Sequence, residues 1–116
     1  MNVLPATVED METFYGFRHR RTVRAFAFVE DGDVRGIVGM CVNTRPLVGF
    51  LTLREDLRER LSRYPRPLIR VVQRLQQHAA SLGLPIVGEA DAAVPQADRF
   101  IVAMGFENKN GVYVWN

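Results

Sequence analysis

The chain has 116 residues and a formal net charge of +2, which suits a single domain with one hydrophobic core. Apolar residues make up 47% and charged residues 24%, a balance that argues against disorder along the whole chain. No apolar run is long enough to span a bilayer, and the first residues lack the basic start and apolar segment of a signal peptide, so we expect no membrane association. The single cysteine, Cys41, excludes an intrachain disulfide and favours a reducing, cytoplasmic location.

The basic residues are unusual, because fourteen of the fifteen are arginine and Lys109 is the one lysine. Arginine suits phosphate, since its planar fork donates two parallel hydrogen bonds. Two clusters are visible: Arg18, Arg20, Arg21 and Arg24 form the first, and Arg54, Arg58, Arg60, Arg63, Arg66, Arg70 and Arg74 form the second. The alternative to phosphate binding is a solvated helix face with ion pairs four residues apart, and this alternative is favoured for the clusters as a whole.

The N-terminal part predicts an edge strand followed by a helix. Residues 1–6 form a short apolar segment, and Thr7 then fits an N-cap, with Asp10 as its capping-box partner. Apolar residues at helical spacing extend the predicted helix from about Val8 to Arg18. Its last turn and the following residues would be basic, which the negative end of the helix dipole favours.

Three strands are expected next, at Thr22–Glu30, Asp33–Val42 and Leu47–Leu53. Asp31-Gly32 is a hairpin signal between the first two, so the three can form an antiparallel meander. Gly36 and Gly39 weaken the second strand and indicate a bulge or close packing. The near-continuous apolar run of the third predicts a strand that is buried on both faces.

A long helix is predicted from Leu68, because the apolar residues that follow it fall on one stripe, and Gly83 fits its C-terminal cap. The charged segment Arg54–Arg63 before it is either a short helix or an ordered loop. A fourth strand at Leu84–Glu89 then completes a β-α-β crossover with Leu47–Leu53, which requires a parallel pair.

The C-terminal part predicts one more helix and a hairpin. Ala90–Val94 is expected to be a loop, and Pro95 fits the first turn of a helix that ends near Gly105. Two short strands, Phe106–Asn108 and Gly111–Trp115, are joined by an Asn-Gly turn. The order is therefore β-α-β-β-β-(loop)-α-β-α-β-β, an α/β chain (α+β, with a mixed sheet) forming a single domain over residues 1–116.

This order resembles that of the GNAT superfamily of N-acyltransferases, of which the chain would be a short, divergent member. The segment Ala97–Phe106 resembles the family's late helix, which commonly ends in an apolar residue, Gly and Phe. In that family the third long strand splays from the fourth, and acetyl-CoA is held in the resulting V. The resemblance implies that the pantetheine pairs with strand backbone near Leu51, Thr52 and Leu53. It also implies that the pyrophosphate lies on free amides at the start of the long helix.

The family's phosphate signature consists of Arg or Gln, two residues, Gly, one residue, and Gly or Ala. It aligns here from Arg63, which matches the first position. Arg66 and Leu68 stand where small residues are expected, and a side chain there can keep phosphate away from the backbone. Pro65 and Pro67 each remove an N–H donor. The resemblance nevertheless implies that Arg63, Arg66 and Leu68 are the phosphate-binding positions.

Many family members protonate the leaving thiolate with a Tyr four residues before the Gly of the late helix. That position is Ile101 here, which cannot donate a proton. The candidate substitutes are Tyr64, Tyr113 and Cys41.

The best-placed general bases are Glu89 and Asp91, at the end of the fourth strand. The alternative for both carboxylates is helix capping or a solvated loop. No metal is expected, since His19 and His78 lack the spacing of metal ligands.

Three functions follow as hypotheses. The first is an acetyl-CoA-dependent N-acetyltransferase in which a primary amine, on a small molecule or a protein, attacks the thioester directly. The single helix between the first two strands, where many acyltransferases carry two, favours an exposed or protein-borne amine. The second is a non-catalytic GNAT-like module that has lost CoA binding and that binds a protein or forms a homodimer. The third, a nucleic-acid binder, is disfavoured, because no second aromatic strand motif accompanies Phe26 and Phe28.

Overall fold

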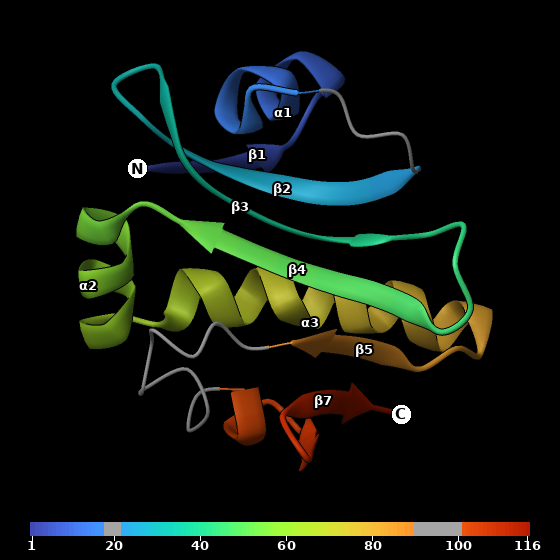
Figure 1. The fold of residues 1–116 in the computed structure, drawn as a ribbon. Helices are drawn as coiled ribbons and strands as arrows, with labels where there is room; N and C mark the ends of the chain where they lie inside the picture. The colour runs from blue at the N-terminus through green and yellow to red at the C-terminus, as the bar shows by residue number, and fades with distance from the viewer. Residues whose placement is uncertain (18–21, 90–100) are drawn as a thin grey trace.

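In a computed structural model of the chain, the described residues are 1–17, 22–89 and 101–116, and they form an α+β fold around a seven-stranded sheet (Figure 1). The strands are β1 (Asn2–Pro5), β2 (Val23–Glu30), β3 (Asp33–Cys41), β4 (Leu47–Leu53), β5 (Ile86–Glu89), β6 (Glu107–Lys109) and β7 (Val112–Trp115). The helices are α1 (Val8–Tyr15), α2 (Glu55–Arg63) and α3 (Arg66–Leu82), and residues 101–103 are also helical.

The sheet has the strand order β1-β2-β3-β4-β5-β7-β6 and is mixed, as predicted. Strands β1 to β4 pair antiparallel in succession, which confirms the meander and the N-terminal edge strand. The β4–β5 pair is parallel and is joined through α2 and α3, and β7 pairs antiparallel with both β5 and β6. The radius of gyration of 13.5 Å is that of one compact domain, for which about 13 Å is expected at this length.

Each face of the sheet has its own core. On one face, α2 and α3 cover the side chains of β2 to β5 that include Phe28, Met40 and Leu47. On the other face, Met11 of α1 packs against Ala25 and Ile37. This arrangement follows from the two-residue period of strands, which sends Phe26 and Phe28 to the α3 face and Ala25 and Ala27 to the α1 face. Figure 1 shows α3 running along β4, with α1 beside β1 and β2.

Helix α1 is shorter than predicted. The Thr7–Asp10 capping box is present, with both hydrogen bonds at 3.0 Å. The helix ends at Tyr15 rather than near Arg18, because Gly16 adopts the left-handed conformation and its N–H closes on the Glu12 carbonyl. The expected basic last turn is therefore wrong, and residues 18–21 lie outside the described residues.

The charged segment after β4 is a helix, which settles the alternative that the sequence leaves open. Leu57 and Leu61 of α2 are buried against the core, while its polar face carries ion pairs with Arg35, Glu30 and within the helix. Helix α3 begins at Arg66, two residues earlier than predicted, and ends at a left-handed Gly83 as predicted.

Strand β5 begins at Ile86 rather than at Leu84. The Leu84 N–H is used by the end of α3, where it donates to the Ala79 carbonyl, and Pro85 has no N–H to offer a ladder. Both hairpin turns are confirmed by positive φ angles, of 50° and 81° at Asp31-Gly32 and of 56° and 89° at Asn110-Gly111. The two strands of the second hairpin, β6 and β7, each begin one residue later than predicted.

The predicted loop over residues 90–94 and the helix start at Pro95 lie outside the described residues. The observed helical residues 101–103 end two residues before Gly105, which has a positive φ of 94°. In β3, the glycines mark both close packing and a bulge, the two alternatives that the sequence offers. A Cβ at Gly39 would lie 2.6 Å from the Ala25 Cβ. Phe28 pairs with Gly36 and Val29 with Val34, so Arg35 of β3, next to Gly36, is the extra residue at the register shift.

Candidate functional site

The parallel pair β4–β5 is very short. Two residue pairs make it up, Leu47 with Ile86 and Val48 with Val87, although both strands continue beyond them. Where the ladder ends, two glycines face each other, and a Cβ at Gly88 would lie 3.3 Å from the Gly49 carbonyl oxygen. The rest of β4, from Gly49 to Leu53, borders a space that we call the β4–β5 cleft.

The prediction that β4 is buried on both faces is wrong for its C-terminal half. Leu47 is fully buried, but the side chain of Leu51 is 43% exposed and Thr52 is exposed as well. The reason is the early end of the β5 ladder, since a strand needs a neighbour and a covering layer on each side to be buried throughout. The apolar run therefore continues into an open edge.

The direction of the backbone groups along β4 can be deduced from two hydrogen bonds. The Leu47 N–H donates across the β5 edge to the Pro85 carbonyl, at 3.0 Å, and the Arg54 N–H donates across the β3 edge to the Arg35 carbonyl, at 2.8 Å. Because these groups alternate along a strand, Thr52 directs its N–H and C=O to β3.

By the same alternation, Leu51 and Leu53 direct their backbone groups into the β4–β5 cleft. The Leu53 carbonyl already accepts from the Arg58 guanidinium, at 3.3 Å. Of the three predicted pantetheine-binding residues, Leu51 is therefore the one whose N–H and C=O both face the cleft without a partner among the described residues.

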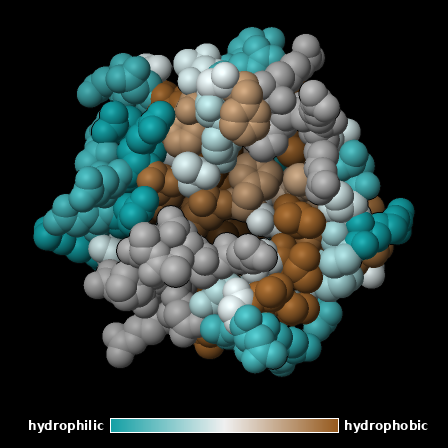
Figure 2. Space-filling view, in the orientation of Figure 1, coloured by the Kyte–Doolittle hydropathy of each residue, from teal (hydrophilic) through white to brown (hydrophobic). Residues whose placement is uncertain are grey.

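An apolar cavity of about 110 Å³ opens at this cleft. Its lining comes from β3, β4 and β5, from Val72 and Leu75 of α3, and from Ile101, Met104 and Phe106 near the C-terminus. Figure 2 shows hydrophobic side chains gathered near the centre of this view, where the surface is hollowed. Few polar groups reach the cavity, so a bound ligand would meet hydrocarbon and strand backbone.

The three candidate proton donors have very different positions. Tyr113 of β7 is 5% exposed and lines the cavity together with Ile101, the position where the GNAT resemblance places a tyrosine. The Tyr113 hydroxyl accepts a hydrogen bond from the Asn108 amide, at 3.4 Å. Tyr64 is 75% exposed, and Cys41 is buried outside the cavity lining. Tyr113 is thus the substitute that the fold brings to the cleft.

Of the two candidate bases, Glu89 alone lies in the described part of the chain. Glu89 is the last residue of β5, where its backbone pairs with Val112 of β7, and Asp91 lies outside the described residues. Glu89 therefore ends the strand that borders the cleft, as the sequence predicts.

The start of α3 offers two backbone donors. Ile69 makes the first helical hydrogen bond, to the Pro65 carbonyl, so the amides of Arg66 and Leu68 have no backbone acceptor in the described part of the chain. The Leu68 side chain is 5% exposed and belongs to the core. Arg66, in contrast, is exposed at the helix start. Arg63 is exposed too and forms an ion pair with Glu59, at 3.1 Å.

One contact at the cleft is not indicated by the sequence. The Tyr15 hydroxyl of α1 donates to the Thr52 Oγ1 of β4, at 3.0 Å, and partial burial raises the pKa of Tyr15. The Arg54 guanidinium lies 4.4 Å from the ring centroid of Phe14, the neighbour of Tyr15. Helical spacing predicts these aromatic residues as core, but no local pattern indicates that they reach β4, which is 37 residues away.

Comparison with protein-family models and with curated proteins finds no match to this chain. No helix in the described part has the length and apolar composition needed to cross a membrane. Within residues 1–17, 22–89 and 101–116, no three His, Cys, Asp or Glu residues gather as a metal site. Function must therefore be inferred from the geometry of the cleft and of the surfaces around it.

Proposed function

We propose that this chain is an acetyl-CoA-dependent N-acetyltransferase with a GNAT-like fold, acting on a primary amine. The observation that carries the proposal is the early end of the β4–β5 ladder, which leaves the Leu51 N–H and C=O facing an apolar cavity. An unpaired strand edge can bind the two amides of a pantetheine arm as it would bind another strand.

The position of α3 supports the same proposal. Figure 1 shows β4 and β5 pointing toward the end of the molecule where α3 begins. The free amides of Arg66 and Leu68 and the positive end of the helix dipole favour an anion there, so the pyrophosphate of acetyl-CoA would lie at this point. The side chain of Arg66 adds a positive charge at the same end, and Arg63 would add a second on leaving its ion pair with Glu59.

The reaction would be a direct transfer. The amine nitrogen attacks the thioester carbonyl carbon, a C–N bond forms, the C–S bond breaks, and the sulfur leaves as a thiolate. Tyr113 is our candidate to protonate that thiolate, because its side chain lines the cavity at the cleft. The proton that the amine loses would go to Glu89 or Asp91.

The acceptor would approach from an open side. Helix α1 has eight residues and packs with β2 and β3 rather than over β5. This short cover favours an exposed amine, such as one carried on a protein, over a small enclosed substrate.

Calorimetric titration with acetyl-CoA tests this proposal. We expect binding in the wild type, because the cleft offers both strand and helix donors, and a rise in melting temperature by mass action. Leu51→Pro removes the N–H that faces the cleft and spares the β3 ladder, so it should weaken binding. Leu51→Ala keeps the backbone donor and is the matched control. The absence of any thermal shift at millimolar acetyl-CoA would overturn the proposal.

A second candidate is a non-catalytic GNAT-like module that binds a protein or forms a homodimer. It is favoured by the small cavity, whose 110 Å³ is below the range of about 300 to 1,000 Å³ that is usual for small-molecule sites. Pro65 and Pro67 also leave the start of α3 with fewer donors than a phosphate site normally offers. The absence of acetyl-CoA binding, together with a dimer in sedimentation, would favour this candidate.

A further inference from the structure

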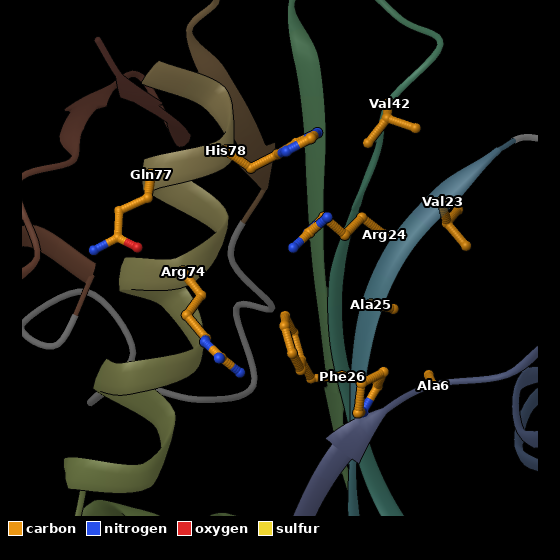
Figure 3. Close-up of a pocket in the computed structure, with 10 residues that line it drawn as sticks. Ala6, Val23, Arg24, Ala25, Phe26, Val42, Arg74, Gln77 and His78 are labelled. Atoms are coloured by element: carbon orange, nitrogen blue, oxygen red, sulfur yellow. The ribbon is translucent and has the colours of Figure 1, made fainter. Parts of the chain in front are cut away.

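A second and larger depression, of about 980 Å³, lies on the other side of α3 (Figure 3). It runs between the second half of α3 and the first half of β2, and we call it the α3–β2 groove. Its apolar surface includes Ala6, Phe26 and Val42, and its basic side chains are Arg24, Arg74 and His78. The volume is at the upper end of the range of about 300 to 1,000 Å³ that is typical of small-molecule sites.

Simple periodicity brings the basic side chains together. Arg24 and Phe26 are two residues apart on β2 and so share the face that α3 covers. Arg74 and His78 are four residues apart on α3 and so share one side of the helix. Figure 3 shows Arg24 pointing toward α3, and Arg74 and His78 pointing toward β2, into the same space.

Among the described residues, no carboxylate neutralises the charge in the groove. None of the described residues that line it is acidic, and neither Arg24 nor Arg74 forms an ion pair with another of them. Arg35, Arg60 and Arg63 differ, since each of them pairs with a carboxylate. The contact recorded for Arg74 is with an aromatic ring, because its guanidinium carbon lies 5.6 Å from the centroid of Phe26.

We propose that the α3–β2 groove binds a small organic phosphate. The phosphate group would lie between Arg24 and Arg74, with His78 as a third donor, and the organic part would rest on Phe26. Arginine forks bind phosphate oxygens in pairs. A phosphate monoester offers three outer oxygens, enough for donors that come from two sides of a groove, whereas a carboxylate offers two oxygens in one plane.

The groove is separate from the β4–β5 cleft. Helix α3 presents Val72 and Leu75 to the cleft but Arg74 and His78 to the groove. Binding of an organic phosphate here therefore does not require that the cleft bind acetyl-CoA or that the chain transfer an acetyl group.

Calorimetric titration with phenyl phosphate tests the proposal. We expect phenyl phosphate to bind more tightly than inorganic phosphate, because the ring covers Phe26, and more tightly than benzoate, because a carboxylate engages fewer donors. Arg24→Gln and Arg74→Gln should each weaken phenyl phosphate binding roughly tenfold, the usual size of a lost charge-assisted contact.

The matched control is Arg70→Gln, since Arg70 is exposed on the same helix, one turn before Arg74, and does not line the groove. It should leave phenyl phosphate binding unchanged. The proposal is overturned if phenyl phosphate does not bind, if benzoate binds as tightly, or if the groove variants bind like the control. Acetyl-CoA should still bind to Arg24→Gln and Arg74→Gln, because the cleft and the groove are separate sites. A loss of phenyl phosphate binding can therefore be distinguished from a loss of acetyl-CoA binding.

Discussion

The two sides of α3 face different kinds of chemistry. On one side, Val72 and Leu75 border a nearly uncharged cleft whose main polar feature is the backbone of Leu51. On the other side, Arg74 and His78 border a groove whose polar features are charged or titratable side chains. A ligand arm in the cleft would be held by hydrogen bonds that salt affects little, whereas an anion in the groove would be held by charges that salt screens.

The difference arises from the helical repeat. The buried stripe of α3 includes Leu68, Val71 and Ala79, and it fixes the helix on the sheet. Residues on either side of this stripe must then face opposite flanks, one toward β2 and one toward β5. A single helix thus separates the two candidate sites, and variants on one flank should leave ligand binding at the other unchanged.

The largest effect is a loss of stability on substitution of Gly39, a residue of the sheet on which both flanks of α3 depend. A Cβ at Gly39 would lie 2.6 Å from the Ala25 Cβ and 2.7 Å from the Arg24 carbonyl, which are too close for the sheet to remain in place. We expect Gly39→Ala to lower the free energy of unfolding by about 3 kcal/mol, measured in urea. Gly49→Ala is the control, since its Cβ would meet the Ile86 Cγ2 at 3.2 Å and a side chain can move. Equal losses in the two variants would contradict this view of the sheet.

The next effect concerns the cleft alone. If Tyr113 protonates the thiolate, Tyr113→Phe should lower kcat for acetyl transfer about 100-fold, because that is a common contribution of a general acid. Binding of acetyl-CoA and of phenyl phosphate should be retained. Tyr64→Phe is the control, since Tyr64 is exposed and outside the cavity. Unchanged kcat in Tyr113→Phe would exclude this residue as the proton donor.

A smaller effect is expected at the start of α3. Arg66→Ala should weaken acetyl-CoA binding roughly tenfold if this end of the cleft holds the pyrophosphate. Arg63→Ala should weaken it less, because Arg63 must first leave its ion pair with Glu59. Titration at two salt concentrations checks the assignment, since the loss in Arg66→Ala should shrink as salt screens the charge. Equal affinity in Arg66→Ala and wild type would place the phosphates elsewhere.

The order of elements is predictable because local residues determine it. Asp31-Gly32 and the Gly83 cap act within a few residues of themselves, and both are confirmed. The same locality explains one error, since apolar spacing continues past Tyr15 but a left-handed Gly16 ends the helix there. The residues of β4 alone could not predict the end of the β4–β5 ladder, because apolar residues such as Leu51 look alike on a covered strand and on an open edge. The expectation that the two strands splay apart came from the resemblance to the GNAT superfamily.

The groove could not be predicted for a further reason. Arg24 and Arg74 fall in two separate arginine clusters, fifty residues apart in the sequence, and both clusters fit solvated faces. Solvation with ion pairs is the correct description for Arg60 and Arg63. Only the packing of α3 against β2 distinguishes these paired arginines from Arg24 and Arg74, which line one groove with no carboxylate partner among the described residues.

The smallest effect is a change in how stability falls with acid. It distinguishes arginines that pair with a carboxylate from arginines that do not. The Arg60 guanidinium donates to the Glu30 carboxylate and lowers the pKa of Glu30 from its ordinary value of 4.5. Because the folded pKa is the lower one, the pair stabilises the fold above that ordinary value, and this stabilisation is lost as pH falls through the folded pKa. Glu30→Gln should therefore flatten the decline of stability with acid, measured by urea unfolding at several pH values.

Arg24→Gln should leave that acid decline as steep as in the wild type, since Arg24 has no carboxylate partner in the described residues. If Arg24→Gln instead flattened the decline as much as Glu30→Gln, then a carboxylate would be paired with Arg24 in the folded protein. The α3–β2 groove would then already be neutralised, and an arriving phosphate would have to displace that carboxylate. The slope of the free energy of unfolding against pH, measured in acid, therefore tests whether the charge on this flank of α3 is available to a ligand.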